Sequence, residues 1–211
     1  MVNTLKSRKR LDNVSISGLT LANGYIKGAD TTAVSGTNFA VTESGVGLYS
    51  LSSGMVNVTD CVITNNIAQG GNATGGTNAY GGDGQGAGIY LGGGTVKLTR
   101  CTISNNSSLG GLGMGGTTQT LDGTGRGAGV YKNSGSLTVE DCTIADNITD
   151  RIAGSVLSNF TQAQGAGIHN ASGVLTVIAL LVYVATILIA TYVAGKRRHP
   201  RGRESGSRAS A

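Results

Sequence analysis

The sequence predicts an all-β fold in which short strands form a stack of similar coils. The stretch GAGIYLGGGTVKLTRCTISNN, residues 86–106, returns as GAGVYKNSGSLTVEDCTIADN, residues 127–147. Gly-x-Gly pairs begin at Gly45, Gly86, Gly127 and Gly165, at intervals of 41, 41 and 38 residues. A fixed period of this length indicates a repeat architecture. Apolar and polar residues also alternate within each copy, which is typical of half-buried strands.

Each copy follows the same order along the chain. The Gly-x-Gly pair precedes an apolar residue and a ring, as in Ile89-Tyr90 and Ile168-His169. A glycine-marked turn and an alternating run such as 95–99 come next. The apolar residues of the run are then spaced by two, three and two, as in Val96, Leu98, Cys101 and Ile103. A gap of three reverses the inward face, so the chain must bend there. We therefore expect three short strands in each coil.

Stacked coils place equivalent residues above one another at the strand spacing of about 4.8 Å. The predicted core columns are Cys61, Cys101 and Cys142, and Ile63, Ile103 and Ile144. We interpret the cysteines as buried packing residues, because Leu19 and Leu180 occupy the same column position. Disulfide bonds are not expected, since a bridge needs Cβ atoms about 3.5–4.5 Å apart. Zinc is not expected either, because no histidine joins the column.

Polar residues also recur in columns. The next position after each core pair holds an amide or acid, and we predict a hydrogen-bonded turn ladder of Asn23, Asn65, Asn105 and Asp146. Just before each cysteine stand Asp60, Arg100 and Asp141. Opposite charges in neighbouring coils attract, so we interpret this trio as structural.

These motifs resemble a known family. The Gly-Ala-Gly-Ile-Tyr and Cys-Thr-Ile-Ser-Asn-Asn phrases are similar to repeats of right-handed parallel β-helix proteins, the pectate-lyase-like architecture, and to polymorphic outer-membrane protein repeats. Those repeats carry Gly-Gly-Ala-Ile and Phe-x-x-Asn, whereas this chain has Gly-Ala-Gly-Ile and Ile-Thr-Asn-Asn. The resemblance implies a right-handed parallel β-helix of four to five coils.

Long glycine-rich segments separate the matching phrases, at 68–85, 107–126 and 149–164. They leave the coil at the same corner, and we expect them to form one irregular loop face where binding would occur, or mobile spacers. Carbohydrate-cleaving β-helices need clustered carboxylates with a basic residue beside them. The weak catalytic candidates are Asp83, Asp122, Arg126 and Asp150. No cofactor or metal is expected, apart from calcium if the protein is such an enzyme.

The net charge of +5 does not indicate nucleic-acid binding. Ten of the sixteen basic residues lie in the terminal segments, which leaves six basic against ten acidic residues between positions 11 and 195. A basic face interleaved with aromatics is missing from the sequence, so a nucleic-acid partner is not expected.

The two ends differ from the repeats. A basic segment, 1–11, precedes the coils at 12–177, and no apolar signal sequence follows it. Residues 174–194 carry no charge and are long enough for a transmembrane helix, with the basic, disordered tail 195–211 on the cytoplasmic side. This candidate span begins inside a repeat. An alternative is therefore a shifted reading frame or a fragment of a larger repeat protein, which the nucleotide sequence would distinguish.

The sequence therefore predicts a non-catalytic repeat scaffold, displayed on a bacterial cell surface or secreted, for adhesion or for binding carbohydrate or a host surface through the loop face. It is expected to act as a monomer or as part of a longer chain, anchored by 174–194 if that segment spans a membrane. The alternatives are a carbohydrate-active lyase or hydrolase, and a truncated product.

Overall fold

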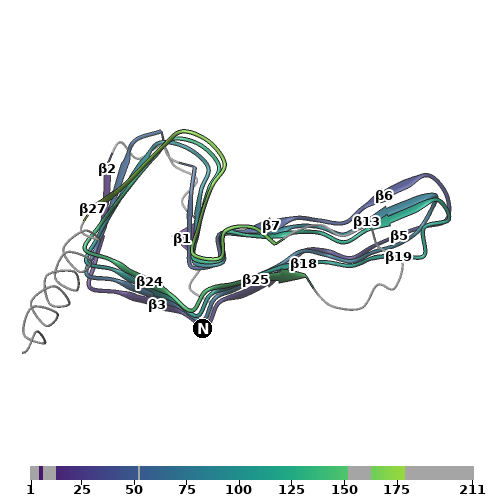
Figure 1. Ribbon diagram of the computed structural model, residues 1–211, viewed down its shortest axis with the longest axis horizontal. Coiled ribbons are helices and arrows are strands. Elements are labelled where there is room, and N and C mark those ends of the chain that lie inside the picture. The colour runs from purple at the N-terminus through teal and green to yellow at the C-terminus, as the bar shows by residue number, and fades with distance from the viewer. Residues whose placement is uncertain (1–4, 7–12, 52, 152–162, 179–211) are drawn as a thin grey trace, which may run out of the picture. The chain divides into compact units, whose positions relative to one another are not determined.

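A computed structural model describes residues 5–6, 13–51, 53–151 and 163–178 (Figure 1). All regular elements in these ranges are β-strands, β1 to β27. Contacts divide the chain into Met1–Val177 and Ile178–Ala211, and the stacked strands belong to the first unit. Val174–Ile178, where the candidate transmembrane segment begins, form strand β27, whereas 179–194 lie outside the described residues. In the described part of the chain, no helix has the length and apolar character to cross a membrane.

The strands form seven sheets, and each sheet takes one strand from each successive coil. Sheets A, B and C form what we call the body. Sheet A contains β1 (Leu5–Lys6), β8 (Leu48–Ser50), β15 (Ile89–Leu91), β22 (Val130–Lys132) and β26 (Ile168–Asn170). Sheet B contains β2 (Asn13–Ser17), β9 (Met55–Thr59), β16 (Thr95–Thr99), β23 (Ser136–Glu140) and β27 (Val174–Ile178). Sheet C contains β3 (Thr20–Ala22), β10 (Val62–Thr64), β17 (Thr102–Ser104) and β24 (Thr143–Ala145).

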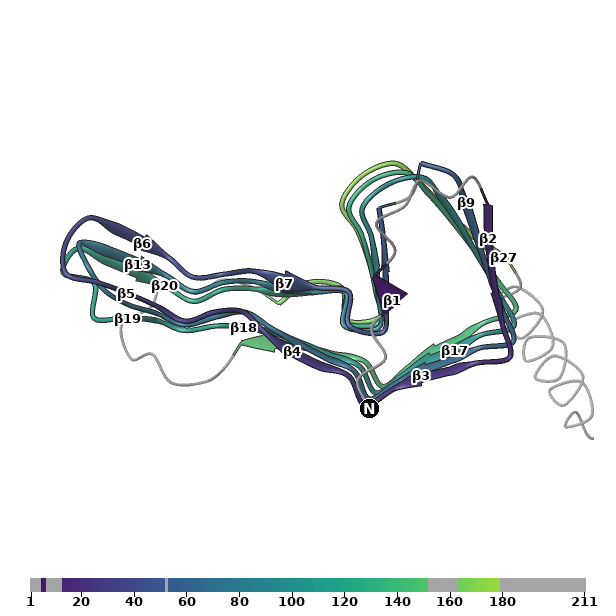
Figure 2. The ribbon, with the colours of Figure 1, turned by 180° about the vertical axis from the view of Figure 1, so that it is seen from behind.

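Sheets D to G form what we call the arm, which projects from the body in both ribbon views (Figure 2). Sheet D contains β4 (Tyr25–Lys27), β11 (Ile67–Gln69), β18 (Ser107–Gly110) and β25 (Ile148–Arg151). Sheet E contains β5 (Thr31–Ala33), β12 (Ala73–Gly75) and β19 (Gly113–Met114). Sheet F contains β6 (Thr37–Phe39), β13 (Asn78–Tyr80) and β20 (Gln119–Leu121). Sheet G contains β7 (Glu43–Ser44), β14 (Gly84–Gln85) and β21 (Gly125–Arg126).

The strand pairing is parallel and in register, as in a parallel β-helix. In sheet B, Val96 stands opposite Val56 on one side and Leu137 on the other. In sheet C, Ile63 stands opposite Leu21 and Ile103, and Ile103 opposite Ile144. The inward side chains of the body therefore form one continuous apolar cluster, which contains Cys61 and Cys101 and against which Cys142 and Ile144 pack.

Left-handed residues make the bends between sheets B and C. Asp60, Arg100 and Asp141 have φ of 52°, 51° and 51°. A residue in this conformation turns the chain, so the apolar residues on either side of it both point inward despite their spacing of three. The predicted bend is present, but each complete coil has seven strands rather than the three expected.

The glycine-rich segments 68–85 and 107–126 contain paired strands and are not the irregular loops that the sequence suggested. In the third segment, 149–164, residues 152–162 lie outside the described residues. Within 68–85 the chain forms β12, β13 and β14, which pair in register with strands of the preceding and following coils. Their alternation is hidden in the sequence because small residues occupy the inward positions. Ala73 and Ala79 are completely buried, where a larger side chain would separate the two layers.

Glycines allow the two layers of the arm to touch through their backbones. A Cβ atom on Gly110 would lie 1.9 Å from the Gly123 carbonyl oxygen, and one on Gly70 would lie 1.8 Å from the Gly82 carbonyl oxygen. Hydrogen bonds cross between the layers here: Gly82 N–H donates to the Gly71 carbonyl at 2.9 Å, and Gly123 N–H to that of Gly111 at 2.8 Å. We call this contact the glycine waist.

Candidate functional site

An aromatic ladder runs along the outside of sheet A. Tyr49, Tyr90, Tyr131 and His169 occupy one column, and successive ring centroids are 4.9, 5.4 and 5.1 Å apart. Interplanar angles of 9°, 18° and 1° show that the rings are stacked. Tyr131 is only 7% exposed, and the other three are half-buried. The ladder therefore offers ring edges, rather than ring faces, to its surroundings.

The first glycine of each Gly-x-Gly pair makes room for a ring. Gly45, Gly86, Gly127 and Gly165 have φ between 55° and 68°. A Cβ atom on Gly45 would lie 2.4 Å from Cδ2 of Tyr49. The repeated phrase of glycine, apolar residue and ring is therefore a structural unit, in which the glycine bends the chain from the arm into sheet A and the ring packs on it.

A polar column belongs to sheet G, which directly precedes sheet A in each coil and lies on the arm (Figure 1). It consists of Ser44, Gln85, Arg126 and Gln164, which are in register in sheet G and its extension. Burial lowers the pKa of His169, and the positive charge of Arg126 adds to this effect. We call the ladder and this column together the corner face.

The structure brings two of the four predicted catalytic candidates together. Asp83 precedes β14, and its Oδ2 accepts a hydrogen bond from Nη1 of Arg126 at 2.6 Å. Its Oδ1 accepts one from the Thr124 backbone N–H at 2.7 Å. Both side chains are about one quarter exposed, at 22% and 28%. The carboxylate of Asp83 is thus paired with the guanidinium of Arg126, which is a member of the polar column.

The other two candidates occupy other positions. Asp122 is buried, and its Oδ1 accepts the backbone N–H of Gly113 at 3.0 Å, so it ties β20 to β19 across the arm. Asp150 lies on β25, opposite Leu109 in sheet D. Among the described residues, no group of three or more His, Cys, Asp and Glu side chains is arranged to hold a metal ion.

A second aromatic pair lies farther out on the arm. Phe39 and Tyr80 stack with centroids 4.9 Å apart, and Phe39 is 66% exposed. The Tyr80 hydroxyl donates to Oε1 of Gln119 at 2.8 Å. Sequence reasoning missed this pair, because Tyr80 lies in a segment that was expected to be a loop and no strand was predicted around Phe39.

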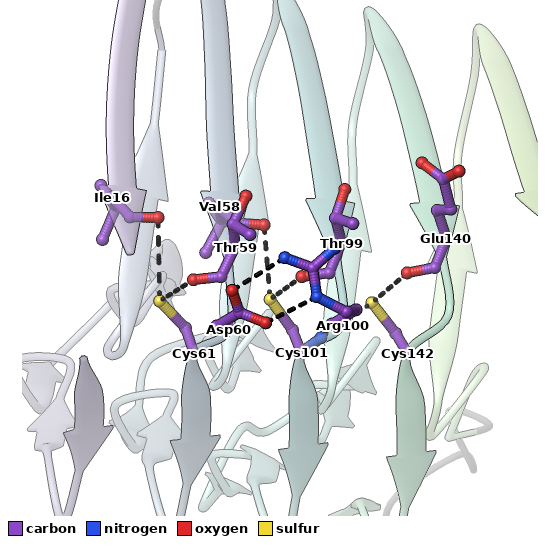
Figure 3. A network of polar contacts seen from close by, with 10 residues as sticks. All are labelled: Ile16, Val58, Thr59, Asp60, Cys61, Thr99, Arg100, Cys101, Glu140 and Cys142. Atoms are coloured by element: carbon purple, nitrogen blue, oxygen red, sulfur yellow. Dashed lines mark hydrogen bonds and ion pairs between the residues drawn. The ribbon is translucent and has the colours of Figure 1, made fainter. Parts of the chain in front are cut away.

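The three cysteines lie in one row (Figure 3). Cys61 and Cys101 are 1% exposed and Cys142 is partly exposed, and all three are free thiols. Each Sγ lies within hydrogen-bonding distance of the carbonyl oxygen two residues earlier, at 3.2 Å for Cys61, 3.4 Å for Cys101 and 3.2 Å for Cys142. The cysteine side chains therefore pack across the bend between sheets B and C, against the ends of the sheet B strands.

Cys142 differs from the other two thiols in its electrostatics. Hydrogen bonding with Cys101 lowers the pKa of Cys142 to about 6. The main cause is the Cys101 thiol, and the Cys101 backbone N–H, whose nitrogen is 3.3 Å from Sγ of Cys142, adds to it. The same interaction, with burial, raises the pKa of Cys101. We therefore expect Cys142 to be the more acidic thiol of the pair.

The asparagine ladder lies one residue later than predicted. Asn23, Asn65, Asn105 and Asp146 have φ between 53° and 60° and are exposed at the bend between sheets C and D. The ladder is formed by Asn66 and Asn106, which are buried, and by Asn147, which is partly exposed. Nδ2 of Asn66 donates to Oδ1 of Asn106 at 3.0 Å, and Nδ2 of Asn106 to Oδ1 of Asn147 at 2.9 Å. The left-handed residue reverses the inward face, which the predicted ladder did not allow for.

The charged columns of the body pair along the stack. Arg100 donates from Nε and Nη2 to the two carboxylate oxygens of Asp60, both at 2.8 Å (Figure 3), and this hydrogen bonding lowers the pKa of Asp60. In sheet B, Nζ of Lys97 lies 2.7 Å from Oε2 of Glu140. These side chains are largely exposed, and such pairs contribute little to stability.

One buried cation was not predicted. Lys132 occupies the inward column of Ser50 and Leu91 and is completely buried. Its Nζ donates to Oδ1 of Asn170 at 3.0 Å and to the Ser172 carbonyl. Burial lowers the pKa of this lysine. Lys132 thus joins β22 to the turn of the next coil.

Comparisons with protein-family models, with curated proteins and with solved structures find no match for this chain. The parallel register of the sheets is therefore what defines the architecture.

Proposed function

We propose that the protein is a non-catalytic scaffold of the right-handed, pectate-lyase-like β-helix type, which binds carbohydrate through its corner face. In this proposal it is secreted or displayed on a cell surface, as in the repeat family that its sequence resembles. The observation that carries the proposal is the parallel course of the aromatic ladder and the polar column along the stack.

The chemistry of the corner face supports a polyhydroxylated ligand. Tyrosine hydroxyls, the Gln85 amide and the Arg126 guanidinium donate and accept hydrogen bonds beside apolar ring edges. Binding sites of this kind combine aromatic surface with a few well-placed polar groups. Because each coil adds one ring and one polar side chain, an extended polysaccharide lying along the stack would meet the half-buried Tyr49, Tyr90 and His169, whereas Tyr131, which is 7% exposed, would contribute little contact.

Two observations favour binding over catalysis. The carboxylate of Asp83 is held by Arg126 and by a backbone N–H, and that of Asp122 by the backbone of the arm. A general acid or base instead needs a carboxyl group that can exchange a proton with the substrate.

The test measures binding of the full chain to a panel of neutral and acidic polysaccharides, with Gln85→Ala and Tyr90→Phe as variants. Tyr90→Phe keeps the stacked ring and removes only its hydroxyl. We expect both variants to weaken binding, whereas Asn57→Ala on sheet B leaves it unchanged. The same polysaccharides are also assayed for the release of new sugar ends, with and without calcium. Release by the unchanged protein that is lost in Asp83→Asn would establish the enzyme alternative and overturn the proposal.

A further inference from the structure

The corner face carries one pair of opposite charges. Oδ2 of Asp83 and Nη1 of Arg126 lie 2.6 Å apart, and the two side chains are 22% and 28% exposed. At pH 7.5 the His169 ring at the end of the ladder is neutral, because burial and the charge of Arg126 hold its pKa below the ordinary value of 6.5. The tyrosines are neutral at this pH as well. The positive charge of Arg126 is therefore balanced by the carboxylate of Asp83.

The acidic residue of β7 points away from the corner face. Glu43 directly precedes Ser44, so its side chain lies on the opposite side of sheet G. Glu43 shares a column with Gly84, where a Cβ atom would lie 2.4 Å from the carbonyl oxygens of Ala68 and Leu109. This side of the sheet therefore faces sheet D, the other layer of the arm.

Two lysines of sheet A do not provide a binding charge beside the pair. Lys132 is turned into the core and completely buried. Lys6 extends the ladder column beyond Tyr49, at the first coil. The charge of Lys6 favours acidic polymers, so a preference of the whole chain for neutral polymers cannot come from it.

Hydrogen bonds hold the Asp83 carboxylate beside Arg126. Its Oδ1 accepts the backbone N–H of Thr124 at 2.7 Å, and its Oδ2 also accepts Nε2 of Gln85 at 3.4 Å. A ligand carboxylate that approached Arg126 would lie beside this fixed carboxylate, and like charges brought together in an interface weaken binding. A ligand hydroxyl can accept one of the remaining guanidinium N–H groups without this cost.

We propose that the corner face selects neutral polysaccharides, built from hydroxyl and ether groups, over polysaccharides that carry uronic acid carboxylates. The rest of the polar column fits this class of ligand. Ser44 and Gln85 on one side of Arg126 and Gln164 on the other offer uncharged donors and acceptors in the same column. The selectivity rests on the proposed carbohydrate binding, because it assigns a ligand class to the same face.

The test compares matched polymers that differ only at C6 of the sugar. Soluble glucan, galactan and mannan are each used unchanged and after oxidation of their C6 hydroxyls to carboxylates. Calorimetric titration measures their binding to the full chain at pH 7.5 and low salt. For each backbone that binds, we expect the neutral form to bind at least about tenfold more tightly, because the acidic form brings like charges together. Added salt should narrow the difference, since it screens the repulsion.

Removal of the Asp83 charge tests the cause of the selectivity. Asp83→Asn keeps the size of the side chain and leaves Arg126 unbalanced, so the acidic form should gain at least about tenfold relative to the neutral form. Asp30→Asn is the matched control and should leave the selectivity unchanged. Asp30 also accepts a backbone N–H, that of Asn72 at 2.7 Å, and pairs with a cation, Lys27, but it lies outside the corner face.

The outcomes separate the selectivity from the binding itself. Acidic forms that bind as tightly as their neutral counterparts would overturn the selectivity and leave the proposed carbohydrate binding intact, whereas no binding of any polymer would overturn both. Circular dichroism checks that each variant is folded. If Asp83→Asn does not fold, Arg126→Gln replaces it and leaves the Asp83 charge unbalanced. The preference for the neutral form should then increase, and its loss would contradict the role of the pair.

Discussion

Two coils have adjacent asparagines at the bend between sheets C and D, and the two residues perform different tasks. Asn105 takes a left-handed conformation with φ of 54° and is exposed, whereas Asn106 is buried. Asn106 accepts the backbone N–H of Asn66 at 3.1 Å and donates to the Ile63 carbonyl at 3.0 Å, besides its side-chain partners. The first asparagine turns the chain and the second joins three coils.

Substitution at these neighbouring positions separates the two tasks. Asn106→Ala removes the ladder's central amide and leaves buried groups unsatisfied, which we expect to lower the free energy of unfolding by about 3 kcal/mol. Asn105→Gly is the matched control, and it should change that free energy by less than about 0.5 kcal/mol because glycine accepts positive φ. Urea denaturation followed by circular dichroism measures both. Equal losses in the two variants would contradict this division of roles.

The acidity of Cys142 has a measurable consequence. With a pKa of about 6, this thiol is mainly thiolate at pH 7, whereas an ordinary cysteine with a pKa near 8.5 is mainly protonated. Alkylation by iodoacetamide, mapped by mass spectrometry, should therefore modify Cys142 first and slow as the pH falls through 6. Cys101→Ala removes the thiol donor and puts no other donor in its place, so the midpoint of the Cys142 rate profile should move to higher pH. An unchanged midpoint in Cys101→Ala would show that the Cys101 thiol is not the cause.

Residue spacing explains why the sequence predicted some columns and missed others. The gap of three between Val58 and Cys61 was visible because apolar residues flank it, and the bend at Asp60 is present. The same gap recurs between Ile63 and Asn66, with Asn65 as the left-handed residue. There the next inward residue is polar, so hydrophobic periodicity carries no signal for it.

At the scale of elements, the arm shows how strands form without apolar alternation. Its layers approach so closely at the glycine waist that backbone atoms replace side chains as the packing surface. Alanine, serine and glycine fill the inward positions, so these segments are read from the sequence as loops. The Asp83 and Arg126 contact was unpredictable for the same reason, because it depends on the register of two such strands.

Adding one methyl group to the waist tests this packing. In Gly110→Ala the new Cβ would lie 1.9 Å from a backbone oxygen, and we expect a loss of about 3 kcal/mol from overpacking. Gly167→Ala is the matched control, since its Cβ would meet Cγ2 of Ile144 at an ordinary 3.6 Å. Thermal melts and limited proteolysis of the arm compare the two. A Gly110→Ala protein as stable and as protease-resistant as Gly167→Ala would contradict the close contact.

At the scale of the whole molecule, stability is shared between nearest neighbours. Each inner strand pairs with the equivalent strand one coil before and one coil after it, as β15 does with β8 and β22. Repeat proteins of this kind behave as a series of similar units with interfaces between them. One unit should therefore be removable if the register is preserved.

Deletion of residues 86–126 tests this expectation, because it joins Gln85 directly to Gly127, which replaces Gly86 at the same column position. We expect a shorter protein with a β-type spectrum and one cooperative melt at lower temperature. Deletion of 86–123 is the control, since it shifts every later column by three residues and should prevent cooperative folding. Identical melts for the two deletions would show that register is not what holds the coils together.

The glycine waist also affects the heat-capacity change of unfolding. Unfolding of a typical domain raises the heat capacity by about 12–15 cal/mol/K per residue, because newly exposed apolar surface contributes positively and polar surface negatively. Separation of the two arm layers exposes mainly peptide groups at Gly71, Gly82, Gly111 and Gly123. The arm should therefore add less to the heat-capacity change than the same number of residues in the body. Calorimetry would accordingly find a stability curve that is flatter than the length of the chain suggests.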